Sequence, residues 1–299
     1  FAAPVLLSAL DGSNGFRMEG IDAGDRSGYS VSGVEDINGD GFDDVIVGAF
    51  LGDAGGDYAA GESYVVFGKA SGFDANVNLS ALNGTDGFRL DGIDALDRSG
   101  IAVSGAGDVN GDGLADILIG ANHALVGAAE QAGETYIIFG QSSGFASAFD
   151  LAALDGSNGI TLKGVSEIDR SGSAVAGAGD VNGDGFSDVI IGAYLANPGG
   201  VYGVGESYVV FGKESWASSI LDLSALDGSN GFRLVGIDVA DHSGSSVSSA
   251  GDVNGDGFDD LLIGAYYAEP AGLGSTGESY VVFGKASGFV PSVSLSSLD

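Results

Sequence analysis

A nine-residue acidic loop with the pattern D-x-N-x-D-G-x-x-D occurs four times in this chain. Successive copies begin 72 residues apart (108 − 36 = 72, and the same from copy to copy), so one unit has been repeated without insertion or deletion. In each copy, the side chains at positions 1, 3, 5 and 9 and the backbone carbonyl of position 7 can direct oxygen atoms toward one cation. Such hard oxygen ligands, without His or Cys, suit Ca²⁺, whereas Mg²⁺ requires a tighter octahedron and usually keeps its waters. We therefore predict about four calcium ions per chain.

The predicted ligands are the same five positions in every copy. They are Asp36, Asn38, Asp40, Phe42 and Asp44 in the first loop; Asp108, Asn110, Asp112, Leu114 and Asp116 in the second; Asp180, Asn182, Asp184, Phe186 and Asp188 in the third; and Asp252, Asn254, Asp256, Phe258 and Asp260 in the fourth.

The start of the loop is also that of an EF-hand loop, whose ligands end in a bidentate Glu at position 12. Position 12 is here Val47, Ile119, Ile191 or Ile263, within a short apolar run typical of a buried strand. The loop is thus predicted to join two strands. Glycines at positions 4 and 6 allow the positive φ angles of a tightly wound loop. The alternative is that Asp, Asn and Gly act here only as turn formers.

Each unit contains four segments with strand character and no sustained helical period. In the second copy these are Phe88–Ile93, Ala102–Gly107, Ile117–Ala121 and Glu134–Phe139. Leu79–Leu82 and its copies could form a single helical turn. Four strands per unit, repeated radially, are typical of a β-propeller, so the predicted fold is an all-β propeller with four 72-residue, four-stranded blades. The predicted single domain spans residues 1–299, with repeats at about 7–78, 79–150, 151–222 and 223–294 and a further copy starting at 295–299.

The composition is strongly acidic, with 42 Asp and Glu against 10 Lys and Arg and a formal charge of −32. Four calcium ions would neutralise only eight of these charges, so the surface should repel nucleic acid and anionic lipid. The 44% hydrophobic content lies in regular runs and argues against disorder. We therefore predict a folded protein with no nucleic-acid partner.

No cysteine is present, so calcium rather than disulfides is expected to stabilise the fold. The sequence has no run of eighteen or more apolar residues and no signal segment, so we predict no membrane insertion. The Phe at position 1 and the single methionine, Met18, indicate a mature or excised segment. Calcium modules of this kind are typical of the millimolar calcium outside cells, which predicts an extracellular or cell-surface location.

Beyond the loop itself, each copy continues with an apolar strand ending in Gly-Ala and then with a segment such as Tyr-Val-Val-Phe-Gly. This arrangement resembles the FG-GAP repeat, the blade unit of the integrin α-subunit propeller and of many bacterial surface proteins. The resemblance covers nearly the whole chain. It implies a calcium site on the hairpin between the first two strands of each blade, at the residues given above, and ligand recognition by loops on the opposite face.

The number of blades departs from the seven of integrin propellers. A closed ring of four is one possibility, in which Phe16–Ile21 supplies the outer strand of the last blade and leaves no open edge. However, the first ten residues and residues 289–298 are copies of the same element, as expected if a further repeat followed. The chain could therefore also be part of a larger propeller or array.

The connections at 50–61, 122–133, 194–205 and 266–277 should lie on the face opposite the acidic loops. Their sequences differ while the frame around them is uniform, which suits partner recognition, although glycine-rich loops also diverge freely. The same face should carry three repeated Asp-Arg-Ser-Gly turns, which contain Arg26, Arg98 and Arg170. These arginines could form a ring of cations for an anionic ligand. We prefer the alternative that each forms a structural ion pair or turn brace. The glutamates that open the fourth strand of each unit (Glu62, Glu134, Glu206 and Glu278) are predicted to bond between blades.

Three functions are compatible with these patterns. The one we favour is a calcium-rigidified extracellular adhesion or ligand-binding module that recognises a protein or a glycan. The alternative is a structural module that assembles itself through its end repeats into a surface layer or filament. A carbohydrate-active enzyme fits less well, because strict repetition leaves no asymmetric constellation of carboxylates for a single active site. We predict that the protein is not an enzyme.

Overall fold

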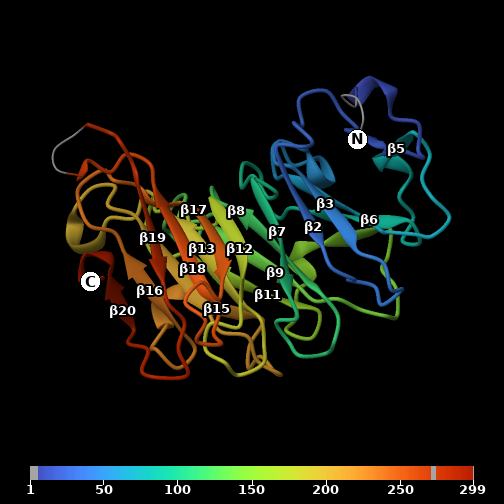
Figure 1. The fold of residues 1–299 in the computed structure, drawn as a ribbon. Helices are drawn as coiled ribbons and strands as arrows, with labels where there is room; N and C mark the ends of the chain where they lie inside the picture. The colour runs from blue at the N-terminus through green and yellow to red at the C-terminus, as the bar shows by residue number, and fades with distance from the viewer. Residues whose placement is uncertain (1–5, 271–273, 299) are drawn as a thin grey trace.

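The computed structural model describes residues 6–270 and 274–298, and these residues form an all-β protein with short 3₁₀ turns (Figure 1). No helix in this part of the chain has the length and apolar character needed to cross a membrane. Four sheets, antiparallel except for a parallel outer strand in the first three, follow one another along the sequence, and each contains the strands that enter and leave one acidic loop. The predicted all-β fold built from propeller blades is confirmed.

The strands of the four blades, in chain order, are as follows. The first blade contains β2 (Ser30–Val34), β3 (Asp44–Ala49), β4 (Glu62–Val66), β6 (Gly87–Asp91) and β10 (Ala148–Asp150). The second contains β7 (Ala102–Gly107), β8 (Asp116–Ala121), β9 (Glu134–Ile138), β11 (Gly159–Lys163) and β15 (Ile220–Asp222). The third contains β12 (Ala174–Gly179), β13 (Asp188–Ala193), β14 (Glu206–Val210), β16 (Gly231–Val235) and β20 (Ser292–Ser294), and the fourth contains β17 (Ser243–Gly251), β18 (Asp260–Ala265) and β19 (Glu278–Val282).

The remaining elements are short. The strands β1 (Arg17–Glu19) and β5 (Asn76–Asn78) pair with each other in a separate two-stranded sheet. The 3₁₀ turns are η1 (Leu7–Ala9), η2 (Ala54–Gly56), η3 (Leu79–Ala81), η4 (Leu151–Ala153), η5 (Pro198–Gly200), η6 (Leu223–Ala225) and η8 (Leu295–Ser297). The single helical turn predicted at Leu79 and its copies is thus confirmed.

The blades are offset from the repeats in the sequence. From the second unit on, the first strand of a unit pairs with the third strand of the preceding blade, as β6 does with β4 and β11 with β9. A fifth, parallel strand that the sequence analysis missed then lies outside it, as β10 does beside β6. Each complete blade therefore draws its three inner strands from one unit and its two outer strands from the next, which ties neighbouring repeats together along the chain.

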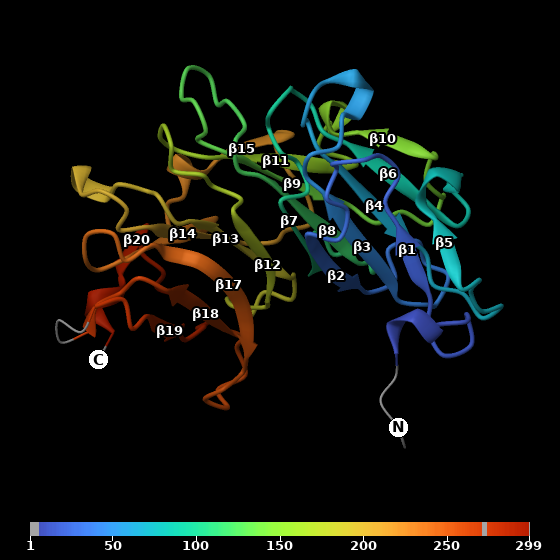
Figure 2. The same cartoon turned by 90° about the horizontal axis from the view of Figure 1, so that it is seen from above.

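The four blades form an arc that stays open on one side (Figure 2). Their innermost strands follow one another in the order β2, β7, β12 and β17, and each packs against the next. Closure of a four-bladed ring by Phe16–Ile21, one of the two possibilities that the sequence left open, is not what the structure shows, because β1, which lies in this segment, pairs with β5 and not with β19. Segment 16–21 instead covers the first blade, because Met18 and Ile21 pack onto its apolar face.

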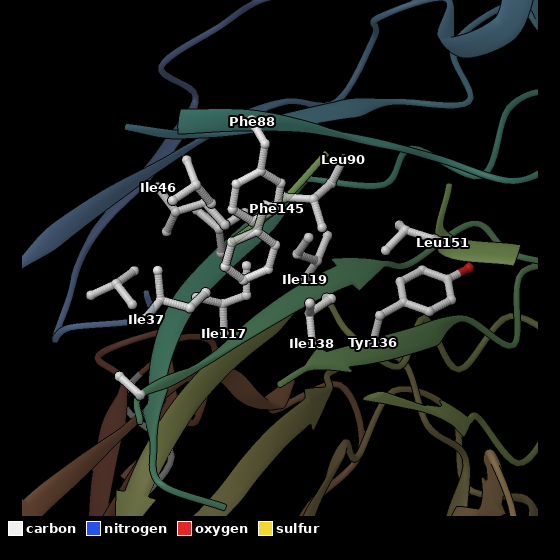
Figure 3. Packing of buried hydrophobic residues seen from close by; sticks show 14 of the residues in the cluster. Ile37, Ile46, Phe88, Leu90, Ile117, Ile119, Tyr136, Ile138, Phe145 and Leu151 are labelled. Atoms are coloured by element: carbon white, nitrogen blue, oxygen red, sulfur yellow. The ribbon is translucent and has the colours of Figure 1, made fainter. Parts of the chain in front are cut away.

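The hydrophobic core lies between the blades. Along β8, Ile117 and Ile119 face the first blade whereas Leu118 faces the third, as the alternation of side chains along a strand requires. Between the first and second blades, the rings of Phe88 and Phe145 stack with centroids 4.1 Å apart (Figure 3). Each inner blade is thus buried on both faces, and its stability depends on the blade on either side.

Candidate calcium loops and the opposite loop face

Each acidic motif forms the hairpin between the two innermost strands of its blade, namely β2–β3, β7–β8, β12–β13 and β17–β18. In the first copy, Asp40 and Phe42 lie at the exposed tip, whereas Asp44 opens β3 and is buried. The structure therefore brings the five predicted ligand positions of each copy onto one short hairpin, and all four hairpins lie at the same end of their blades.

The first aspartate of the motif organises the loop through backbone hydrogen bonds. One carboxylate oxygen of Asp36 accepts the N–H of Gly39 at 2.7 Å and that of Asp40 at 3.0 Å, and the other accepts the N–H of Gly41 at 2.7 Å. Both glycines have positive φ, 75° and 88°. Asp108, Asp180 and Asp252 make the same three bonds in their loops. The motif is therefore a stable turn in its own right.

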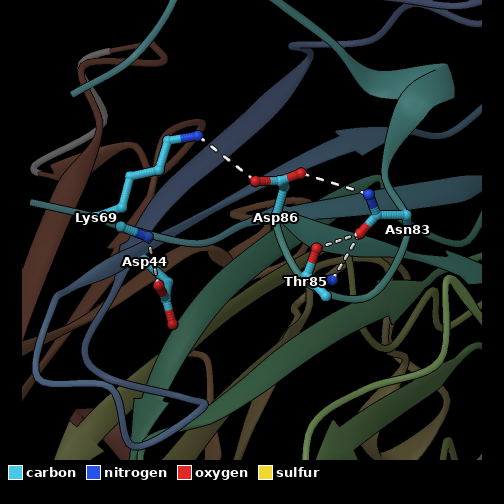
Figure 4. A network of polar contacts seen from close by, with 6 residues as sticks. Asp44, Lys69, Asn83, Thr85 and Asp86 are labelled. Carbon is cyan, nitrogen blue, oxygen red and sulfur yellow. Dashed lines mark hydrogen bonds and ion pairs between the residues drawn. The ribbon is translucent and has the colours of Figure 1, made fainter. Parts of the chain in front are cut away.

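The last aspartate of the motif joins the loop to the third strand (Figure 4). Asp44 accepts the backbone N–H of Ile37 at 3.1 Å and that of Gly68 at 2.8 Å. The equivalent carboxylates of Asp116, Asp188 and Asp260 do the same in their blades. Burial raises the pKa of Asp44 to about 6, that of Asp116 to about 7 and that of Asp188 to about 8. These carboxyl groups would gain from a positive charge nearby.

The donor set of each loop has the chemistry that calcium needs. Each loop offers three carboxylates, one amide and one carbonyl, and no Lys or Arg of the described residues pairs with any of these acids. The arrangement itself is that of a hydrogen-bonded turn: the side-chain oxygen of Asn38 accepts the N–H of Asp40 at 2.8 Å, and its amide donates to the Asp40 carboxylate at 3.2 Å. In the described part of the chain, no three acidic or histidine side chains cluster closely enough to hold a metal ion.

Position 7 of the motif has a packing role that the sequence analysis missed. The side chains of Leu114, Phe186 and Phe258 lie against the position-4 glycine of the preceding loop, Gly39, Gly111 and Gly183 respectively. At Gly111, an added Cβ would come within 2.4 Å of the Phe186 ring. The glycine is therefore required both for its positive φ and for the next blade's apolar side chain.

The Asp-Arg-Ser-Gly turns brace neighbouring blades through the backbone. Arg98 has a φ of 61° and donates its N–H to the carbonyl of Ala59 in the preceding blade, at 3.1 Å, and Ser99 donates to Ala60 at 2.9 Å. Arg170 and His242 make the equivalent backbone bonds. The turn brace is confirmed, but the predicted ion pair with the adjacent aspartate is absent among the described residues.

The glutamates that open the third strand of each blade bond within the blade, so the prediction of bonds between blades is wrong. Glu134 accepts the hydroxyl of Tyr136 at 2.9 Å and pairs with Lys163 of the adjacent strand at 3.6 Å. In the same way, Glu206 pairs with Arg233 at 3.4 Å. The reason is the offset of the blades, which places the first strand of the next unit beside the glutamate.

The variable connections lie at the opposite end of the blades, between the second and third strands. Several of their tyrosines are exposed, including Tyr58 at 68% and Tyr202 at 64%. A cleft of about 490 Å³ opens between the loops of the third and fourth blades. It is lined by Tyr202, Asp238, Asp241, His242, Tyr267 and Glu269, among others. Position 242 is Arg in the other three units, so this cleft departs from the repeat symmetry that the sequence analysis expected.

Comparison with known proteins agrees with this geometry. The chain is 30% identical over 250 residues to integrin alpha-V of Gallus gallus, covering 82% of this chain and 20% of that protein. It is 28% identical over 231 residues to integrin alpha-5 of Xenopus laevis (74% and 19%) and 33% identical over 169 residues to integrin alpha-IIb of Mus musculus (54% and 14%). The chain thus spans only about a fifth or less of the length of these relatives.

A family model matches the chain at residues 27–66, 99–138, 171–210 and 243–282. Each matched segment begins at the serine of an Asp-Arg-Ser-Gly or Asp-His-Ser-Gly turn and ends with the third strand, so it contains the acidic hairpin and the three inner strands of one blade. This match is the FG-GAP repeat, which confirms the resemblance noted in the sequence, and the chain belongs to the FG-GAP repeat family.

Proposed function

We propose that this chain is an extracellular ligand-binding propeller module in which calcium, bound by the four acidic loops, is structural. The observation that supports the proposal most is the fourfold repetition of a hairpin with three carboxylates and no cationic partner among the described residues. A turn alone needs only the first aspartate and the glycines. The repeated Asn38, Asp40 and their equivalents are the additional oxygen donors that a calcium site uses.

In this proposal, calcium supplies positive charge to the loops and takes no part in any reaction. The residues that would hold it are the side chains at positions 1, 3, 5 and 9 and the carbonyl at position 7 of each loop. Asp36 already orders the backbone, and Asp44 already fixes the loop to β3 and β4. A small rotation of the Asn38 and Asp40 side chains, which are bonded to each other at the tip, is the change we expect on binding.

Replacing Asp40 with alanine should abolish one calcium site of four. We expect the bound calcium, measured by elemental analysis after dialysis at moderate calcium, to fall from about four to about three ions per chain. Asp43→Ala is the matched control, because Asp43 is an adjacent exposed aspartate outside the ligand pattern. An unchanged calcium content in Asp40→Ala, or an equal loss in Asp43→Ala, would contradict the assignment.

The ligand is proposed to bind the face that carries the variable connections. Exposed tyrosines give large contact area at a low entropic cost, and the cleft between the third and fourth blades adds the carboxylates of Asp238, Asp241 and Glu269. Such a surface suits hydroxyl or cationic groups of a glycan or protein partner. The integrin names of the relatives support an adhesion role of this kind.

The double variant Tyr202→Ala and Tyr267→Ala should lose at least about tenfold in affinity for any such partner. The probe is a panel of immobilised glycans and extracellular-matrix proteins, screened with the calcium-loaded chain. Tyr58→Ala is the control, because Tyr58 occupies in the first connection the position that Tyr202 occupies in the third. Retention of full binding by the double variant would place the ligand elsewhere on the molecule.

A further inference from the structure

The second blade breaks the repeat symmetry at one position of its fourth strand. In the first and third blades, Arg89 and Arg233 each lie opposite a buried tyrosine of the third strand. Each arginine pairs with the glutamate that opens that strand, at 3.6 Å and 3.4 Å. The equivalent residue of the second blade is Thr161, opposite Tyr136. The second blade therefore lacks the guanidinium group that its two neighbours hold at this place.

A lysine at another position compensates the glutamate of the second blade. Lys163 lies two residues further along β11, directly opposite Glu134, and pairs with it at 3.6 Å. The equivalent residues of the first and third blades are Asp91 and Val235, which are not bases. The pairing of the glutamate is thus kept in all three blades. The space that an arginine at position 161 would fill is not needed for that purpose.

A hollow of about 320 Å³, lined in part by Thr161, opens in the second blade. Its lining includes the apolar side chains of Ile93, Leu125 and Leu151 and the carboxyl groups of Asp94, Asp97 and Glu134. The corresponding hollow of the third blade has a volume of about 200 Å³. Arg233 lines that hollow, and none of its described lining residues is acidic. The exchange of arginine for threonine thus goes with a larger hollow that reaches the carboxyl groups.

The carboxyl groups in the second-blade hollow outnumber the bases. Asp97 is only 6% exposed and Asp94 is exposed, and neither pairs with a base among the described residues. Lys163, which pairs with Glu134, is the single base among the described lining residues. Burial, together with the carboxylates of Asp94 and Glu134, raises the pKa of Asp97 to about 7. A cation bound in the hollow would relieve this repulsion.

The hollow is a feature of this chain rather than of the repeat. Its lining residues lie between residues 93 and 220, in a blade that is covered by another blade on both faces. Most of them lie outside the segments 99–138 and 171–210 that match the FG-GAP repeat. Part of the wall comes from η4 and β15, which that repeat does not include. The family relationship therefore does not assign a ligand to this hollow.

We propose that the second-blade hollow binds an arginine side chain of a protein partner. The guanidinium group would lie beside Asp94 and Asp97, and its aliphatic stem would lie against Ile93 and Leu125, as arginine stems commonly cover apolar surface. Arginine is the occupant because the side chain that Thr161 replaces in the repeat is an arginine, whose planar donor group suits carboxylates. The inference rests on the proposed ligand-binding function, of which it names the chemistry of the partner.

The test is a titration of the isotope-labelled full chain with the peptide acetyl-Gly-Arg-Gly-amide, followed by NMR in calcium at low salt. We expect a dissociation constant on the order of 1 mM and shifted backbone signals at Asp94, Asp97 and Thr161. The matched probe is the same peptide with citrulline in place of arginine, which keeps the shape of the side chain and removes its charge. It should bind at least about tenfold more weakly, because its hydrogen bonds to carboxylates carry no positive charge.

Thr161→Arg should abolish binding of the arginine peptide, because the chain's own guanidinium group would then fill the hollow as in the neighbouring blades. Thr161→Ser is the matched control, since it removes only a methyl group and should bind as the parent does. A thermal melt checks that both variants are folded. Asp94→Asn removes one exposed carboxylate from the hollow and should weaken the peptide about threefold, with no change in melting temperature.

Three results would overturn the inference: equal affinity for the arginine and citrulline peptides, unchanged binding by folded Thr161→Arg together with Asp94→Asn, or signal shifts confined to another part of the chain. None of them would contradict the proposed function, which the panel of matrix proteins and glycans tests separately. Conversely, a chain that binds the arginine peptide at Thr161 but no member of that panel would support the hollow as an arginine site and contradict the proposed function alone.

Discussion

Removal of calcium by an excess of chelator should lower the melting temperature by about 20 °C or more. A site held at a hundred times its dissociation constant stabilises the folded state by about 2.7 kcal/mol, so four sites contribute about 11 kcal/mol. A domain has a net stability of only about 5–15 kcal/mol. The effect is large because each empty loop also retains three carboxylates within nine residues, in a chain whose formal charge is −32.

The melt has an internal control in the chain itself. A variant with alanine at Asp40, Asp112, Asp184 and Asp256 should melt at the same temperature with and without chelator, near that of the chelated parent. Addition of excess calcium should restore the parent and leave this variant unchanged. If the parent melts identically in both conditions, the acidic motifs are turns alone, and the bonds that Asp36 and Asp44 make to backbone N–H groups account for them completely.

The sequence predicted the elements of the fold better than their assembly. The strands and the 3₁₀ turn at Leu79 follow from local alternation and apolar runs, which the chain repeats four times. The pairing partner of Phe88–Ile93 could not be derived in this way, because an alternating strand fits the edge of its own blade and that of the preceding blade equally well. Segment 76–78 was missed because a three-residue strand leaves no periodic pattern.

For the candidate site, the sequence correctly placed all four loops on strand hairpins. It could not show which of the predicted ligands also have a structural role, through hydrogen bonds or packing. Asp44 and its equivalents are buried and bonded to two backbone N–H groups, a role that depends on the distant Gly68. Likewise, the packing of Phe186 on Gly111 depends on the angle between two blades. Both features follow from contacts between segments far apart in the chain, which spacing within one motif does not contain.

Gly120→Ala should destabilise the protein by about 3 kcal/mol, at the upper end of what overpacking of a core usually costs. Gly120 lies within β8, where an alanine Cβ would come within 2.0 Å of the carbonyl oxygen of Gly172 in the next blade. Its φ is not positive, so the backbone itself accepts alanine. The whole effect should therefore come from separating two blades, which also loosens the core around Leu118.

The matched control for this variant is Gly264→Ala in the fourth blade. Gly264 occupies the same position of its unit, but an added Cβ there meets only Ser246 of the same blade, whose hydroxyl oxygen at 2.3 Å can rotate away. Urea unfolding should show a change of less than about 1 kcal/mol in the free energy of unfolding for Gly264→Ala. If the two variants lost equal amounts of stability, the close approach of neighbouring blades would not be the reason that glycine is needed at position 120.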